Sequence, residues 1–209
     1  MDKASTINKI LKHALAEFAV HGVDGISGRQ ISKEAGVNHA SINYYFGSKQ
    51  EMYLELVRRA VEYFEDRHDE AYSKIASFLK EKNPSKERAV AYIKELLNIT
   101  RKDISAESFA SFQLLVRREE IFPTDAFGVL YENVVKPYVK ATTALIKIAR
   151  DDISQEQATA MATLFMTMNL AQVHCKEGIV RSHNKTTFDA DLEKLYFDSA
   201  DLIIDNFLK

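Results

Sequence analysis

The chain has 209 residues, of which 46% are hydrophobic and 28% are charged, and its formal net charge is -2. This is the composition of an ordinary globular protein with a buried core. The balanced charge excludes a global basic field that would attract nucleic acid, so any DNA-binding surface must be local. The chain contains seven glycines and three prolines. Because sheet-rich proteins use both residues in their many turns, this scarcity favours an all-α fold.

The single cysteine, Cys175, leaves no partner for an internal disulfide and favours a reducing, cytoplasmic location. We expect no signal peptide at the N-terminus. Residues 157–175 carry no formal charge, but their threonines and amides make insertion into a bilayer costly, so we expect a buried helix there. His174 and Cys175 are helix neighbours about 100° apart, which makes a poor chelating pair. We expect no metal and no cofactor; the alternatives are a thiol-sensing role for Cys175 and divalent-cation binding by the acidic run at 65–70.

Five of the seven glycines lie within the first 47 residues, which predicts a domain of short helices at 1–47 and one of long helices at 48–209. An apolar stripe predicts a first helix that ends at Gly22. A capping box at 27–30 is expected to begin a second helix, and Asn38 is expected to cap a third that runs through residue 46.

Stretches with little glycine or proline predict the remaining helices, over about 48–82, 84–101, 105–118, 124–150, 154–177 and 187–208. Ser48 and a second capping box at 154–157 are expected to begin two of them. Pro137 is expected to kink the helix over 124–150. About nine helices are predicted in all.

The second and third predicted helices have the spacing of a helix-turn-helix, whose second helix fits the major groove of DNA. The outer face of that helix carries short donors and acceptors of the kind that read base edges, and Asn43 could pair with adenine. Arg29, Tyr45 and Lys49 lie around it and are suited to phosphate contacts. Residues 1–50 hold six basic and four acidic side chains, a local excess of +2. Short helices with polar outer faces are common, so these features alone leave a purely structural role open.

A dense set of residues between positions 10 and 49 decides between these interpretations. It comprises Ala14, Leu15, Phe18-Ala19, Gly22, Ser27-x-Arg29-x-Ile31, Ala35-Gly36-Val37 and Ile42-Asn43-Tyr44-Tyr45-Phe46-Gly47-Ser48-Lys49. This segment resembles the N-terminal domain of the TetR/AcrR family of bacterial transcriptional regulators. The resemblance implies base contacts by Asn38, His39, Ala40, Ser41 and Asn43, and phosphate contacts by Arg29, Tyr44, Tyr45 and Lys49. In the family an aromatic residue is frequent at the position of Asn43 and proline at that of Gly47; the first departure bears on base preference.

Residues 117–127, Arg-Arg-Glu-Glu-Ile-Phe-Pro-Thr-Asp-Ala-Phe, resemble a segment of one subgroup of this family that has its own type of C-terminal domain. In the family this domain binds a small molecule and forms the dimer. The resemblance therefore implies a ligand-responsive repressor that leaves a palindromic operator when its effector binds.

The chain after residue 47 is rich in aromatic residues and methionine. Each such residue is foremost a candidate for plain core, and a subset is predicted to line an apolar cavity with a few polar groups. This composition favours a hydrophobic or aromatic effector. The predicted lining comprises Phe64, Phe109, Phe112, Gln113, Phe127, Tyr131, Phe165, Met168, Asn169 and His174.

The last two predicted helices carry apolar residues on more than one face, and one has threonines spaced four residues apart. Small side chains permit close approach of two helices, so both features favour a two-fold homodimer interface. A fully buried monomer core is the alternative. The predicted interface residues are Thr159, Thr163, Thr167, Leu195, Leu202 and Ile203.

Three hypotheses of function follow. The first, which we predict, is a cytoplasmic DNA-binding repressor whose partners are operator DNA, a small-molecule effector and a second copy of the chain, with no membrane. The second is a helical enzyme, although the sequence has no glycine-rich phosphate loop, nucleophile elbow or His-Glu-x-x-His run. The third is an interaction module that uses helix-turn-helix geometry without DNA.

Overall fold

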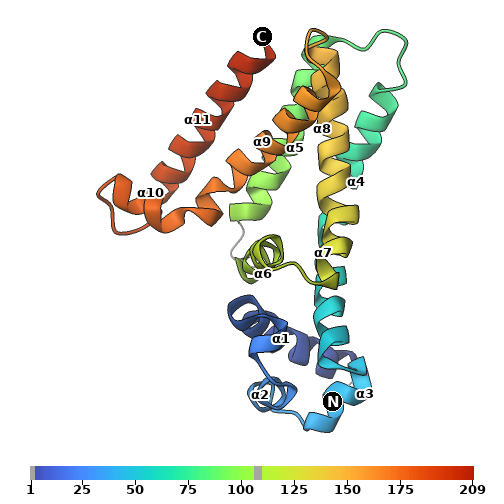
Figure 1. Ribbon diagram of the computed structural model, residues 1–209, viewed down its shortest axis with the longest axis vertical. Coiled ribbons are helices and arrows are strands. Elements are labelled where there is room, and N and C mark those ends of the chain that lie inside the picture. Colours follow the sequence, from blue (N-terminus) through green and yellow to red (C-terminus); the bar gives the residue numbers. More distant parts are fainter. Residues whose placement is uncertain (1–2, 106–109) are drawn as a thin grey trace. The chain divides into compact units, whose positions relative to one another are not determined.

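The computed structural model describes residues 3–105 and 110–209. In these two ranges every regular element is a helix and no strand is present (Figure 1), which confirms the predicted all-α fold. The contacts divide the chain into two compact units, the first made of residues 1–65 and 107–134 and the second of residues 66–106 and 135–209. The division predicted from the sequence is different and falls at Gly47, between a DNA-binding domain and an effector-binding and dimerisation domain. That functional division stays a prediction.

The first helix, α1 (Lys3–Gly25), carries the apolar stripe that its sequence predicts. Ile10, Ala14 and Phe18 are completely buried, and burying a side chain the size of isoleucine or phenylalanine stabilises a fold by about 1.5–3 kcal/mol. Gly22, where the helix was predicted to end, has φ +72° and breaks the regular helical geometry. A short turn then continues to the end of α1.

The two helices that follow begin at the caps the sequence predicts. Before α2 (Gly28–Glu34), the Gln30 amide donates to Ser27 Oγ (3.2 Å) and the Ser27 amide donates to Gln30 Oε1 (2.9 Å), which completes the capping box. Before α3 (His39–Phe46), the side-chain oxygen of Asn38 accepts from the amide of the second helical residue. Local sequence therefore fixes where both helices start.

The long helix α4 (Lys49–Phe78) begins after Ser48, whose Oγ accepts a hydrogen bond from the Glu51 amide (3.0 Å). It has 30 residues and ends four residues before the predicted limit at 82. The chain passes from the first unit to the second within this helix, between Glu65 and Asp66. A single continuous helix thus contributes to both units.

The single kinked helix predicted over 124–150 is wrong in detail. The structure has α7 (Asp125–Leu130), a π-helical turn η2 (Tyr131–Val135) and then α8 (Lys136–Ala149), with Pro137 in the first turn of α8. Proline has no amide hydrogen to donate to the carbonyl four residues earlier, so the hydrogen-bond register can change there without losing a bond. The helix therefore changes its hydrogen-bond register before Pro137 instead of bending at that residue.

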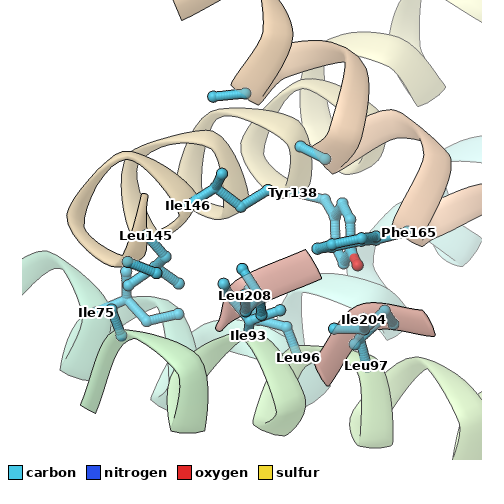
Figure 2. Packing of buried hydrophobic residues seen from close by; sticks show 14 of the residues in the cluster. Ile75, Ile93, Leu96, Leu97, Tyr138, Leu145, Ile146, Phe165, Ile204 and Leu208 are labelled. Carbon is cyan, nitrogen blue, oxygen red and sulfur yellow. The ribbon is translucent and has the colours of Figure 1, made fainter. Parts of the chain in front are cut away.

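The second unit is built on α5 (Lys86–Ser105), α8 and α9 (Gln155–His174), which pack against one another, with α11 (Ala190–Leu208) packed on α9. Figure 2 shows side chains from these helices and from the end of α4 meeting in one core. The labelled members are Ile75, Ile93, Leu96, Leu97, Tyr138, Leu145, Ile146, Phe165, Ile204 and Leu208.

The uncharged segment 157–175 forms most of α9, which begins at the predicted capping box of Ser154 and Gln157. It buries one face only, and the opposite face is exposed. The helix ends at His174 rather than at 177, and α10 (Lys176–Ser182), which the sequence analysis did not predict, follows. None of the helices in the described ranges has the length and hydropathy needed to cross a membrane.

Candidate nucleic-acid interface

The helix-turn-helix is assembled by a turn that α2 and α3 share. Gly36 has φ +59°, a conformation that glycine adopts without strain. The Val37 amide donates to the carbonyl of Ser32 (2.9 Å). Ile31 is completely buried and Ile42 is 1% exposed, so α2 and α3 turn their apolar sides toward the same core. The polar side of α3 is therefore left outward.

That outward side carries the predicted base-reading residues. His39, Ala40 and Asn43 are exposed, and Ser41 is half-buried. Tyr44 is 79% exposed, which is unusual for a large aromatic side chain and is typical of contact surfaces. The structure thus brings these residues together on one face of α3.

The predicted phosphate-contacting residues surround this face, and one of them also has a structural role. Arg29 is exposed on α2, and Tyr45 is half-buried with its ring centre 5.0 Å from that of Tyr44. Lys49 Nζ donates to the carbonyl oxygen of Ile26 (3.0 Å), so it joins the first turn of α4 to the loop before α2. An ammonium has three donors, which leaves two for a phosphate.

Two further features of this surface bear on its contacts with DNA. Asn38, the predicted cap of α3, accepts from the Ala40 amide with its side-chain oxygen (2.9 Å), which leaves its amide nitrogen and the second lone pair of that oxygen for DNA. A Cβ at Gly28 would lie 3.1 Å from Cε1 of His39, tighter than ordinary contact. Gly28 therefore lets the imidazole lie against the start of α2, a relationship that only the packing of the two helices reveals.

The predicted effector residues are divided between the two compact units. In the first, the rings of Phe64 and Phe112 are 5.6 Å apart, those of Phe127 and Tyr131 are 6.3 Å apart, and Gln113 is half-buried. Phe109 lies outside the described residues. The pocket assignment for this group stays a prediction.

In the second unit, two of the predicted effector residues, Phe165 and Met168, take part in the hydrophobic core. Phe165 is completely buried, and its ring packs edge-on against Phe207 at 5.8 Å. Asn169 accepts from Arg101 Nε (3.0 Å) and donates to a backbone carbonyl of α5. Met168 packs against the same core, and His174 is half-buried at the end of α9. Their part in ligand binding also stays a prediction.

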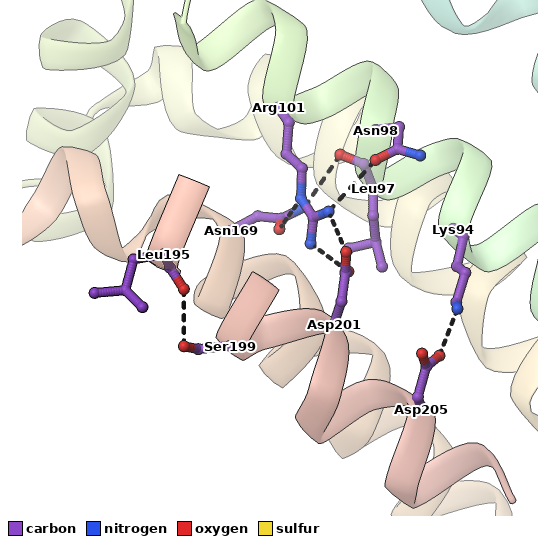
Figure 3. Close-up of polar contacts among 9 residues, drawn as sticks. All are labelled: Lys94, Leu97, Asn98, Arg101, Asn169, Leu195, Ser199, Asp201 and Asp205. Carbon is purple, nitrogen blue, oxygen red and sulfur yellow. Dashed lines mark hydrogen bonds and ion pairs between the residues drawn. The ribbon is translucent and has the colours of Figure 1, made fainter. Parts of the chain in front are cut away.

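A partly buried ion pair in the second unit escaped the sequence analysis (Figure 3). The guanidinium of Arg101 donates to both carboxylate oxygens of Asp201, at 2.9 and 2.7 Å, and lies over the ring of Phe197 at 4.7 Å. With its bond to Asn169, Arg101 joins α5, α9 and α11. Lys94 and Asp205 form a second, more exposed pair between α5 and α11 at 2.6 Å.

The residues predicted for the dimer interface are exposed in the single chain. The hydroxyls of Thr159, Thr163 and Thr167 each donate to the backbone carbonyl four residues earlier, at 3.0, 3.1 and 2.8 Å. Their hydrogen-bonding needs are thus met without a partner chain. On α11, Leu195, Leu202 and Ile203 are 46%, 63% and 54% exposed, and Leu164 on α9 is 52% exposed.

The described residues contain no group of three or more His, Cys, Asp or Glu side chains that could hold a metal ion. The features that stand out are a helix-turn-helix with a polar outer face and a separate helical unit. This combination defines the class of helix-turn-helix transcriptional regulators.

Comparison with known families agrees with this class. Residues 10–56 match the model of the bacterial regulatory proteins of the tetR family, and residues 86–205 match the C-terminal domain of the HTH-type transcriptional dual regulator CecR. The chain belongs to the TetR family of bacterial regulatory proteins, with a C-terminal domain of the CecR type. The matched families are transcriptional regulators, which decides against the enzyme hypothesis.

Individual relatives fit the same assignment. The chain is 29% identical over 145 residues to the dual regulator CecR of Shigella flexneri, an alignment that covers 66% of this chain and 61% of that one. It is 34% identical over 70 residues to IcaR, a negative transcriptional regulator of the biofilm operon icaADBC in Staphylococcus epidermidis, covering 32% and 38% of the two chains. The chain thus spans less than two thirds of the length of these relatives.

Solved structures share the whole fold. SCO4454, a TetR-family transcriptional regulator from Streptomyces coelicolor, is similar with a TM-score of 0.67 at 12% identity, over 99% of this chain and 97% of that one. A TetR transcription regulator from Haloarcula marismortui gives 0.59 at 14% identity, over 97% and 98%. At such identities the likeness shows the fold.

Proposed function

We propose that this chain is a cytoplasmic, ligand-responsive repressor that binds a palindromic operator as a homodimer. The observation that carries the proposal is the outward face of α3, where exposed polar side chains and Tyr44 lie on the side away from the buried Ile42. A helix buried on one side with base-reading groups on the other is what the major groove accepts. The naming of one relative as a negative regulator supports repression.

The reading domain in this proposal is residues 1–47, and residues 48–209 bind the effector and form the dimer. The exposed apolar residues on α9 and α11 support dimerisation through these helices, because a second copy would remove them from water. The threonine row of α9 has its hydroxyls bound internally and offers small side chains for close approach.

The effector in this proposal is a small hydrophobic or aromatic molecule, supported by the aromatic residues among the predicted lining. Helix α4 directly follows α3, the helix that reads the DNA in this proposal (the reading helix), and continues into the second unit. A shift of α4 would change the spacing of the two reading helices in a dimer, and half-sites are read at intervals of ~34 Å. The effector must bind more tightly to the dimer whose reading helices do not match the half-site spacing than to the dimer that fits the operator. Otherwise it could not release the operator.

Selection of binding sites from random DNA tests the proposal. The full chain should enrich a two-fold symmetric sequence whose half-sites are separated by about one helical turn or a multiple of it. An Asn43→Ala variant should enrich a sequence changed within the half-sites while the symmetry is kept. Enrichment of no sequence, or of a site without two-fold symmetry, would contradict the proposal.

A further inference from the structure

The segment that marks the subgroup, residues 117–127, has no role in the functions proposed so far. The structure places its first half at the end of α6 (Ala110–Ile121), which packs on α1 within the first unit. Here Arg118 lies directly over Gly22. A Cβ on Gly22, whose φ is +72°, would lie 2.2 Å from Nε of Arg118. The position therefore requires glycine twice over, for its backbone conformation and for the space that the guanidinium takes.

The guanidinium of Arg118 makes two further contacts that hold it there. It donates to the carbonyl oxygen of Val20 at 3.5 Å, and it lies over the ring of Phe122 at 5.7 Å. Arg118 thus joins the last turn of α6 to the point at which the geometry of α1 breaks.

The neighbouring residue, Glu119, makes the second connection. It is 1% exposed, and a buried carboxylate is stable only when hydrogen bonds replace its water. Its oxygens accept from the Tyr53 hydroxyl (2.5 Å), from the Thr124 amide (3.0 Å) and from the Thr124 hydroxyl (3.0 Å). Glu119 therefore joins α6 to α4 on one side and to the N-cap of α7 on the other.

Tyr53 carries this connection into the core of the first unit. Burial, and then the hydrogen bond to Glu119, raise the pKa of Tyr53, so its hydroxyl keeps its proton and donates. Its ring packs edge-on against Phe18 of α1 at 5.1 Å. A continuous set of contacts thus runs from Thr124 through Glu119 and Tyr53 to the centre of α1.

From these contacts we propose that Arg118 and Glu119 are positioning residues for DNA binding, which hold α6 on α1 and α4 so that the reading helices have one fixed orientation. All of these contacts lie within the first unit, which holds α1, α6 and the first part of α4. The inference rests on the proposed function, because it takes α3 as the DNA-reading helix.

The test compares Arg118→Ala and Glu119→Gln with neighbouring control variants, Arg117→Gln and Glu120→Gln, all in the full chain. Glu120 is exposed and Arg117 is half-buried. Two quantities are measured: affinity for the full palindrome and affinity for a duplex with one half-site. Hydrogen exchange of the α1 amides reports the docking of α6 without DNA.

We expect both test variants to lose at least about tenfold in palindrome affinity, a coupling within the usual range for linked sites, while half-site affinity stays within about twofold. Exchange in α1 should become faster in the test variants and remain unchanged in the controls. Gly22→Ala should weaken palindrome binding less in the presence of Arg118→Ala than alone, because the clash is gone. Arg118→Ala and Glu119→Gln are independent tests, so either one keeps the inference testable if the other variant does not fold.

Palindrome affinity equal to that of the wild type in both test variants would overturn the inference, even if exchange in α1 is faster. An equal loss on palindrome and half-site would also overturn it, because the reading helices themselves would then be damaged. A wild-type chain that binds no palindrome would overturn the proposed function and this inference with it. The two failures are thereby distinguished.

Discussion

Lys49 Nζ donates a hydrogen bond to the carbonyl oxygen of Ile26, which lies 23 residues earlier in the chain, at 3.0 Å. The bond joins the first turn of α4 to the loop that precedes α2. A side chain predicted to contact phosphate therefore also holds the helix-turn-helix against the helix that leads away from it. The two roles are compatible, because an ammonium donates in three directions.

Lys49→Met should therefore have two separable effects. Loss of the bond to Ile26 should lower the free energy of unfolding by about 1 kcal/mol. Loss of a phosphate contact should weaken binding to all DNA sequences alike and reduce the salt dependence of binding by about one phosphate. Urea unfolding and DNA titration over a salt series measure the two effects. Lys80→Met, at an exposed lysine after α4, is the control and should change neither.

Asn43→Ala and Ser41→Ala should change which operator sequence is preferred. Both residues lie on the outer side of α3, and a good base contact contributes about 1–3 kcal/mol of discrimination. Competition between the wild-type operator and single-base variants measures the change, and binding to non-specific DNA should be unaltered. A uniform weakening on every sequence would show that these side chains contact phosphate or only support the helix.

Asp201→Asn should destabilise the second unit far more than Asp205→Asn. The side chains of Asp201 and Asp205 are similarly exposed, at 37% and 39%, but Asp201 binds Arg101, which is 10% exposed, with both oxygens, whereas Asp205 binds Lys94, which is 40% exposed. We expect a loss of about 2 kcal/mol in the free energy of unfolding for Asp201→Asn and about 0–1 kcal/mol for Asp205→Asn. Urea unfolding of the two variants, which differ by one helical turn on α11, decides the matter, and equal losses would refute the assignment.

Leu202→Asp should convert the proposed dimer to a monomer. Its side chain is 63% exposed on α11, and two carboxylates that face each other across a two-fold axis would have to be desolvated together. Leu79→Asp, at a leucine 37% exposed after α4, is the matched control. Sedimentation at equilibrium gives the mass of each variant, and a wild-type chain that sediments as a monomer would refute the interface.

The parts of the fold that were foreseen depend on local rules. The capping boxes at Ser27 and Ser154 and the cap at Asn38 involve residues two or three positions apart, so the sequence alone predicts them. The scarcity of glycine and proline predicts the helical class. The polar face of α3 follows from helical periodicity once the apolar positions are known.

The parts that were missed depend on contacts distant in sequence. Arg101 and Asp201 are 100 residues apart, and Tyr53 and Glu119 are 66 apart, so no periodicity connects them. The π-helical turn ahead of Pro137 was missed because a proline signals an interrupted register but not where the interruption falls. The short helix α10 was missed because α9 was expected to continue to 177.

The central claim is that this chain recognises a specific operator through α3. The most direct test is a titration of the full chain on the DNA upstream of its own gene, at two salt concentrations and with non-specific competitor DNA. We predict tight binding that resists the competitor, weakens at the higher salt concentration and protects a palindrome from cleavage. No binding at either salt concentration, or binding that the competitor removes at both, would contradict recognition of an operator at this locus.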